Sequence, residues 1–280
     1  MHTMQIQSLA DRELLNNGIE MPWFGLGTWL TREGTEVENS VSWALQAGYR
    51  SIDTAAIYGN EVGVGKAIKQ SGIPREDIFV TTKLWNNDQR NGRIKEAFES
   101  SLKKLGLDYI DLYLIHWPIQ GRYKQAWKIM EKIYKTGKVK AIGVSNFLSH
   151  HLEDLLDSVE IVPAVDQVEF HPRLQLPDLQ DTCCKLGIQL EAWSPIMKGR
   201  VLNIPELVDI GDKYGKNAVH VTLRWMIQKQ IITIPKTVRK ERIISNADIY
   251  NFELSEDEMR LIDGLDQNIR IGEDPDNVSF

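Results

Sequence analysis

The stretch IFVTTKLWNNDQRNGRIKEAFESSLKKLGLDYIDLYLIH spans residues 78–116 and predicts a strand, a helix and a second strand. Its two ends, 78–83 and 109–116, are short apolar runs with the length and branched side chains typical of buried strands. Between them, Ile94 and Phe98 begin an apolar face at helical spacing, and Gly106 marks the end of that helix. Strands connected by helices in this way predict a parallel sheet.

The same alternation continues in both directions along the chain. Eight strands that alternate with helices favour a closed (β/α)8 TIM barrel over an open sheet. Before the first strand, Asn16, Asn17 and Gly18 predict the tight turn of an N-terminal β-hairpin. No linker interrupts residues 1–280, which are predicted to form a single barrel domain. The eight apolar runs are FGLGT (24–28), YRSID (49–53), IFVTTK (78–83), YIDLYLIH (109–116), VKAIGVS (139–145), AVDQVEF (164–170), IQLEAWS (188–194) and IITIPK (231–236).

The composition limits the kinds of molecule that the protein is expected to bind. The chain has a formal net charge of −6, which gives no general attraction for nucleic acid or anionic membranes, so neither is a predicted partner. No apolar run approaches the ~20 residues that span a bilayer, and the first 15 residues lack the pattern of a secretion signal. The adjacent Cys183 and Cys184 are predicted to be reduced thiols, so the expected location is the cytoplasm.

Metal chemistry is not predicted. Two cysteines without neighbouring ligands do not make a zinc site. His150, His151, His171 and His220 are interpreted as structural, because none has a sequence partner at metal-ligand spacing.

Four side chains of different acidity fall where predicted strands end. Asp53, Lys83 and His116 lie at or just past the ends of their strands, and Tyr58 follows Asp53 by five residues. Strand ends of a parallel barrel converge on one rim, so these four residues are predicted to share a pocket. Each one alone has a structural interpretation, as an ion pair, a strand cap or a loop tyrosine. Their joint occurrence indicates an enzyme.

The chemistry of this group suits carbonyl reduction. The ammonium of Lys83 is expected to lower the pKa of Tyr58, so that the phenol acts as a general acid. Asp53 supplies the counter-charge that an ammonium needs in a partly dry pocket. A neutral His116 can donate a hydrogen bond that orients a substrate oxygen.

Several stretches together resemble the aldo-keto reductase family over essentially the full chain. This resemblance implies that Asp53, Tyr58, Lys83 and His116 are the catalytic tetrad, with Tyr58 as the proton donor and NADPH as the hydride source. The short loop after His116 and the tail GEDPDN resemble the compact bacterial branch, the glyoxal/methylglyoxal reductases or 2,5-diketogluconate reductases, which implies small α-dicarbonyls such as methylglyoxal, or 2,5-diketogluconate-like compounds, as substrates. The family's usual form is a monomer. The matching stretches are GLGTW (25–29), GYRSIDTAAIYGNEVGVG (48–65), KLW (83–85), LDYIDLYLIHWP (107–118), GKVKAIGVSNF (137–147), QVEFHP (167–172), EAWSP (191–195) and IPKTVRKERI (234–243).

The cofactor site is assigned by the same resemblance, because the chain has no complete glycine fingerprint: Gly63 and Gly65 lack the third glycine. Trp193 stands where many relatives have Tyr, and Ser245 where many have Glu. Trp29 and Trp117, with Tyr58 and His116, are the predicted substrate contacts, ahead of Trp23 and Trp85. The predicted cofactor contacts are Thr28, Trp29 and Asp53, then Ser145, Asn146 and Gln167 at the nicotinamide carboxamide, Trp193 on the nicotinamide face, Ser194 and Pro195 toward the pyrophosphate, Lys236, Thr237 and Arg242 at the 2′-phosphate, and Asn246 at the adenine.

Two other classes of function are weighed against the reductase. A nicotinamide-binding sensor on the same barrel would turn over little substrate, and fold alone does not separate it from an enzyme. The intact tetrad favours the enzyme, because a sensor has no need of an activated phenol. A metal-dependent hydrolase is disfavoured, since no His/Asp ligand cluster falls at the strand ends.

Overall fold

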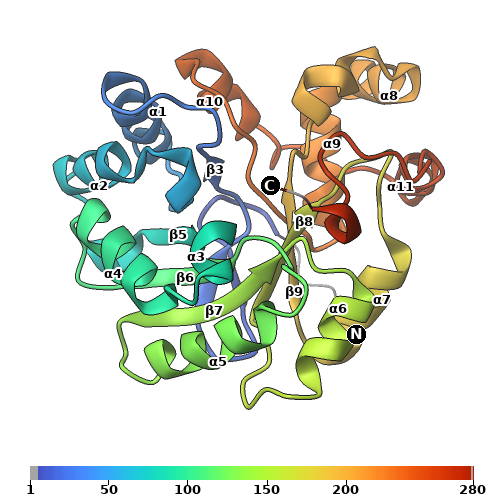
Figure 1. Cartoon of the computed structure of the whole chain (residues 1–280). Helices are drawn as coiled ribbons and strands as arrows, with labels where there is room; N and C mark the ends of the chain where they lie inside the picture. Colours follow the sequence, from blue (N-terminus) through green and yellow to red (C-terminus); the bar gives the residue numbers. More distant parts are fainter. Residues whose placement is uncertain (1–5, 279) are drawn as a thin grey trace.

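Eight parallel strands form the centre of the computed structural model, which describes residues 6–278 and 280 (Figure 1). Residues 1–5, part of the N-terminal stretch without a secretion-signal pattern, and residue 279 lie outside the described residues. The strands pair in chain order, from the first to the eighth. Their bounds are β3 Leu26–Gly27, β4 Ser51–Asp53, β5 Phe79–Leu84, β6 Ile110–Ile115, β7 Val139–Ser145, β8 Val165–Glu169, β9 Gln189–Trp193 and β10 Ile232–Thr233.

Parallel bridges join the first and last strands and close the barrel. Phe24 pairs with Thr233, and Gly27 pairs with Lys236. A Cβ at Gly27 would lie 2.8 Å from the carbonyl oxygen of Ile234, so a side chain there would push the two strands apart. The predicted (β/α)8 barrel is therefore confirmed, and each of the eight apolar runs matches one of its strands, with β5 extending one residue past its run to Leu84.

The helices surround the strands in one outer layer (Figure 1). Helix α4 shows why they do so: it buries Ile94, Phe98 and Leu105 and ends at Gly106, whose φ of 64° suits glycine. The helices are α1 Thr35–Gln46, α2 Glu61–Gln70, α3 Asn86–Arg90, α4 Ile94–Leu105, α5 Tyr123–Tyr134, α6 Ser149–Leu156, α7 Pro177–Leu186, α8 Pro205–Tyr214, α9 Ala218–Gln228, α10 Lys240–Asn246 and α11 Glu256–Asp263.

The predicted hairpin is also confirmed. Strands β1 (Arg12–Leu14) and β2 (Glu20–Pro22) are antiparallel, and Gly18 in their turn has a φ of 83°. The side chains of Asn16 and Asn17 donate to the carbonyl oxygens of Pro163 and Lys140. Those carbonyl groups lie at the starts of β8 and β7. The hairpin therefore packs at the amino-terminal end of the barrel strands, opposite their carboxyl ends.

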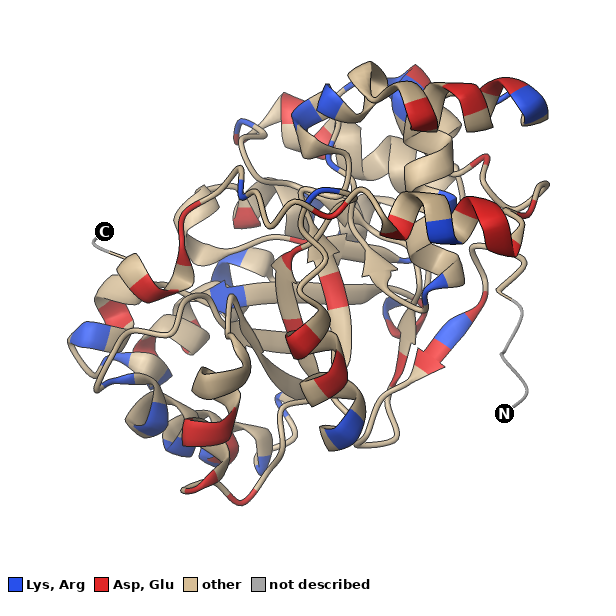
Figure 2. Cartoon of the chain, turned by 90° about the vertical axis from the view of Figure 1, so that its right-hand side faces the viewer, with Lys and Arg blue, Asp and Glu red and all other residues tan. Residues whose placement is uncertain are grey.

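Basic and acidic residues are interspersed along the outer elements in the view of Figure 2. Cys183 is buried and Cys184 is exposed, and both are free thiols. Within residues 6–278 and 280, the helices are all too short or too polar to cross a bilayer.

Candidate active site

A fully buried ion pair lies at the carboxyl ends of β4 and β5. The Nζ atom of Lys83 donates to Asp53 Oδ1 at 2.6 Å, to Asp53 Oδ2 at 2.7 Å and to the Thr54 carbonyl oxygen at 2.9 Å. The Lys83 side chain has no exposed surface, and that of Asp53 is 3% exposed. Three acceptors match the three hydrogens of an ammonium, so Lys83 acts on other neighbours chiefly through its charge.

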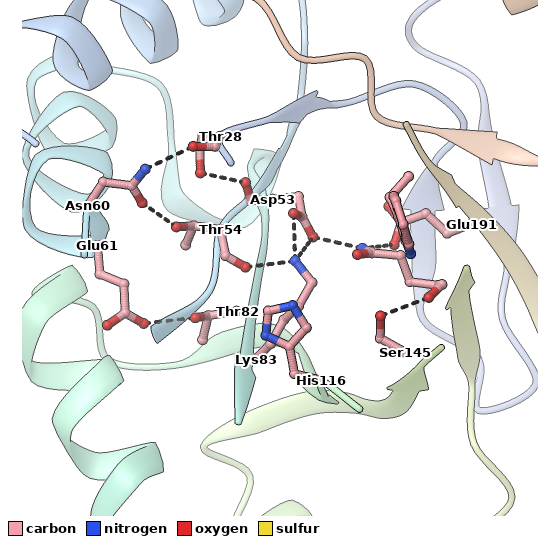
Figure 3. A network of polar contacts seen from close by, with 12 residues as sticks. Thr28, Asp53, Thr54, Asn60, Glu61, Thr82, Lys83, His116, Ser145 and Glu191 are labelled. Atoms are coloured by element: carbon pink, nitrogen blue, oxygen red, sulfur yellow. Dashed lines mark hydrogen bonds and ion pairs between the residues drawn. The ribbon is translucent and has the colours of Figure 1, made fainter. Parts of the chain in front are cut away.

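Further hydrogen bonds extend from Asp53 across the barrel interior (Figure 3). The Nε2 atom of Gln167 donates to Asp53 Oδ2 at 2.8 Å and to Glu191 Oε2 at 2.7 Å. Glu191 is completely buried, and burial together with the nearby charge of Asp53 raises its pKa to about 8. We call Asp53, Lys83, Gln167 and Glu191 the barrel network.

Tyr58 lies beside the ammonium, at the end of the short 3-10 helix Ala56–Tyr58. Its ring centre is 5.1 Å from Lys83 Nζ. Burial raises the pKa of Tyr58, and the charge of Lys83 opposes this without reversing it. The expectation of a net lowered pKa is therefore wrong, because the cost of placing a phenolate in the interior exceeds the attraction of a lysine that Asp53 already neutralises.

His116 follows β6 and meets Tyr58 edge-on, with ring centres 5.8 Å apart. Burial and the charge of Lys83 hold the pKa of His116 well below its ordinary value, so the imidazole is neutral at physiological pH. Its Nδ1 atom is buried and accepts or donates no hydrogen bond within the described part of the chain. The structure thus brings all four predicted tetrad residues together.

Aromatic rings surround the imidazole. Trp85 meets His116 edge-on at 5.2 Å between ring centres, and Phe280 stacks on Trp85 at 5.7 Å. Trp117 is buried and contacts both His116 and Phe280. Trp29 is 47% exposed, with the ammonium of Lys198 5.4 Å from its ring centre. Trp23 is a core residue, only 1% exposed.

The predicted carboxamide contacts come together beside the barrel network. Ser145 Oγ donates to the Gln167 carbonyl oxygen at 2.8 Å. Asn146, in the left-handed region with a φ of 64°, donates from Nδ2 to the His116 carbonyl oxygen. Its Oδ1 atom accepts from the indole N–H of Trp193 at 2.8 Å. The Trp193 ring is held by this bond and by the tail, since a Cβ at Gly272 would lie 2.3 Å from its edge.

Thr28, Ser194 and Pro195 line the strand ends nearby. The hydroxyl of Thr28 donates to the Asp53 carbonyl oxygen at 2.9 Å, and the side chain is 1% exposed. The hydroxyl is therefore already hydrogen-bonded within the protein. Ser194 is half-buried with a φ of 55°, and Pro195 is buried.

The basic segment, residues 236–242, follows β10 and enters α10. Lys236 Nζ donates to the Leu30 carbonyl oxygen at 3.2 Å, and partial burial lowers its pKa. Thr237 Oγ1 accepts from the Arg239 amide. Arg242 is exposed, and its guanidinium forms no ion pair or side-chain hydrogen bond with any residue in the described ranges. Asn246 is buried at the end of α10.

The comparisons with known proteins agree with this geometry. The model of the Aldo/keto reductase family matches residues 24–267. The chain belongs to this family. It is 54% identical to glyoxal reductase of Bacillus subtilis (strain 168) over 98% of this chain and 99% of that protein. It is 46% identical to methylglyoxal reductase DkgA of Escherichia coli (strain K12), over 94% of this chain and 96% of that protein.

A solved structure supports the same assignment. MGS-M4, an aldo-keto reductase enzyme from a Medee basin deep-sea metagenome library, matches with a TM-score of 0.93 at 47% identity. The match covers 96% of this chain and 100% of that chain. The protein is therefore an oxidoreductase of the aldo/keto reductase family, whose members reduce carbonyl groups with a nicotinamide cofactor.

The residues of this aldo/keto reductase fit such a cofactor. Both hydrogens of the Gln167 amide are used by carboxyl groups, which leaves Oε1 as the side-chain atom that can meet a carboxamide N–H. The exposed Arg242 can meet a phosphate.

One histidine interpretation needs correction. Asp276 from the C-terminal tail comes within 2.9 Å of His150 Nε2 and 3.2 Å of His151 Nε2, so these histidines do have a partner. However, His151 Nδ1 accepts the Leu148 amide, which leaves the proton of the neutral ring on Nε2. His151 Nε2 therefore carries the ring proton, and no lone pair on it remains for a metal ion.

Sequence reasoning missed Glu191 and Phe280, and it placed Trp85 behind Trp29 although the Trp85 ring meets that of His116. An acidic residue inside the apolar run 188–194 was the available signal for Glu191, since buried strands rarely contain one. No local pattern indicates Phe280, whose contact with Trp85 links residues far apart in the chain.

Proposed function

We propose that the protein reduces small α-dicarbonyls such as methylglyoxal to alcohols, with NADPH as the hydride source and Tyr58 as the proton donor. The observation that carries this proposal is the buried Lys83–Asp53 pair beside Tyr58 and a neutral His116. The relatives named glyoxal reductase and methylglyoxal reductase support the choice of substrate class.

A bound reduced nicotinamide supplies the hydride that adds to the carbonyl carbon. As negative charge grows on the carbonyl oxygen, the Tyr58 hydroxyl donates its proton to that oxygen. A raised pKa keeps Tyr58 protonated at neutral pH, and the charge of Lys83 stabilises the phenolate that remains. His116 donates a hydrogen bond that orients the same oxygen. Solvent then returns a proton to Tyr58.

The preference for NADPH over NADH is assigned to the basic segment. Lys236 and Arg242 supply positive charge, and Thr237 supplies a hydroxyl, for a phosphate dianion. A hydrogen bond to a charged group contributes about 1.5–3 kcal/mol, more than a neutral one, so this contact favours the phosphorylated cofactor. Trp29, Trp85, Trp117 and Phe280 provide an apolar surround for the substrate.

The decisive test follows loss of NADPH absorbance with methylglyoxal or phenylglyoxal as substrate. Tyr58→Phe removes the proton and should lower kcat by about 10²–10⁴-fold. Tyr134→Phe, on the outer helix α5, is the matched control and should leave kcat unchanged. Full activity in Tyr58→Phe would exclude the proposed donor, and an inactive wild type that binds NADPH would favour a sensor.

We further propose that residues 1–280 act as one catalytic unit, as a monomer in the cytoplasm. The single continuous hydrophobic core of the barrel and the free thiols Cys183 and Cys184 support this. Elution of the pure protein as a dimer in size-exclusion chromatography would contradict the monomer.

A further inference from the structure

Glu191 places a carboxyl group in the barrel interior, at a position where an apolar side chain would make the fold more stable. It faces the interior from β9, is 0% exposed, and its Oε1 atom has no hydrogen-bond partner among the residues described. A buried carboxyl group with one unsatisfied oxygen destabilises a folded protein. Such a group persists when it has a function that an apolar residue cannot supply.

Within the described residues, the side-chain hydrogen bond of Glu191 is with Gln167. The two residues are register partners on β9 and β8, and Glu191 Oε2 accepts from Gln167 Nε2 at 2.7 Å. The same nitrogen donates to Asp53, which is held by Lys83 and offers only acceptor atoms. An amide in the reverse orientation would place its oxygen against the oxygen of Asp53, which is repulsive.

We propose that Glu191 is a positioning residue for the nicotinamide end of the cofactor site, because it shares the Gln167 amide with Asp53 and so fixes which end of that amide a cofactor meets. With both hydrogens used, Gln167 presents Oε1, an acceptor suited to a carboxamide N–H. Without Glu191, one amide hydrogen loses its partner, and Asp53 alone holds the Gln167 side chain. This inference rests on the proposed function, in which Gln167 contacts the nicotinamide carboxamide.

The groups that act on Glu191 come from three places. Asp53 on β4 raises its pKa, Gln167 on β8 and Lys83 on β5 lower it, and burial dominates, which gives a value of about 8. The other neighbouring strand, β10, contributes only Ile232 and Thr233. At neutral pH the Glu191 carboxyl group is therefore protonated, so glutamine is a close chemical mimic of it.

Affinities for NADPH and NADH, measured by quenching of tryptophan fluorescence, test the proposal. Glu191→Met removes the acceptor and should weaken both cofactors alike by about tenfold, the scale of one buried hydrogen bond. Glu191→Gln keeps an acceptor and should restore both affinities. Glu61→Gln alters a second buried acid, bonded to Thr82 and outside the barrel network, and should change neither. Wild-type affinity in Glu191→Met, or an equal loss in Glu191→Gln, would overturn the proposal.

The thermal stability of the cofactor-free protein gives a readout independent of activity. An unfolded glutamate releases its proton near pH 4.5, whereas folded Glu191 keeps it to about pH 8, so Glu191 makes stability fall as pH rises between these values. The difference in Tm between Glu191→Gln and wild type should therefore grow in favour of Glu191→Gln as the pH rises from about 5 to about 8. A constant difference would show that Glu191 is not the protonated acid described here. Failure of the proposed function would instead appear as absent carbonyl reduction in the wild type.

Discussion

The barrel network and the basic segment lie at opposite ends of the proposed cofactor site, and they are built in opposite ways. In the network, Lys83 has no exposed surface, and each of its three hydrogens has an acceptor within 2.9 Å. In the basic segment, Arg242 is exposed and its guanidinium is unpaired within the described residues. The Lys83 charge is paired before a ligand arrives, whereas the charge of Arg242 is left for the ligand to pair.

This difference matches the two tasks. Proton donation depends on charges that are already in place when negative charge develops, because reorganising them during the reaction costs free energy. Recognition of a phosphate tolerates side chains that order on binding, since charge attraction acts before the final contacts form. Substitutions of the Lys83–Asp53 pair should therefore affect turnover, and substitutions in the basic segment should affect affinity for the phosphorylated cofactor.

The largest effect is expected from Lys83→Met. Loss of the ammonium removes the charge that stabilises the Tyr58 phenolate and leaves Asp53 without its counter-ion, so kcat should fall by about 10³-fold or more. The NADPH dissociation constant should change little, because Lys83 is enclosed by protein acceptors. Stopped-flow turnover and equilibrium binding measure the two quantities separately.

Lys104→Met is the matched control, because Lys104 also faces a buried acid, Glu61, at 3.6 Å but lies outside the network. It should keep wild-type kcat. If Lys83→Met lost affinity and kept kcat, the division of tasks between the two regions would be wrong.

A smaller and selective effect is expected from Arg242→Ala. The NADPH dissociation constant should rise about 10–100-fold, the scale of one charge-assisted hydrogen bond, while the NADH constant stays constant. Isothermal titration with both cofactors measures this ratio. Arg260→Ala, an exposed arginine on α11 that pairs with Asp257, serves as the control. Equal losses of affinity for both cofactors would show that Arg242 does not contact the 2′-phosphate.

The smallest effect is the response to salt. Exposed charges are screened over about 8 Å at physiological ionic strength, whereas buried pairs are screened much less. Raising the salt concentration should weaken NADPH binding by a few-fold, leave NADH binding nearly constant, and leave kcat at saturation unchanged. A salt-sensitive kcat would indicate that solvent reaches the barrel network.

The fold was predictable because each strand and helix carries its own local pattern. The runs 78–83 and 109–116 are apolar over the length of a strand, and Gly106 supplies the helix end between them. The barrel topology then follows from the number of strands and their alternation with helices. The shortest strands, β3 and β10, show the limit of this reasoning, since their runs are longer than the paired residues.

The site was predictable only in part. The strand ends that carry Asp53, Lys83 and His116 were visible in the sequence, but the direction of the Tyr58 pKa shift depends on burial, which no motif encodes. The contact of Asp276 with His150 and that of Phe280 with Trp85 join residues more than a hundred positions apart. Such contacts are set by the path of the tail, which is irregular and has no periodic pattern.

The enclosure of Lys83 has a chemical consequence under the proposed function, in which the substrates are dicarbonyls. These compounds condense with free amines, and the reaction needs an unprotonated nitrogen that the reagent can reach. The amine of Lys83 is protonated through its contact with Asp53 and sealed from the reagent by the strands around it. Under the proposed function, the lysine on which turnover depends is thus protected from reaction with the dicarbonyl substrate.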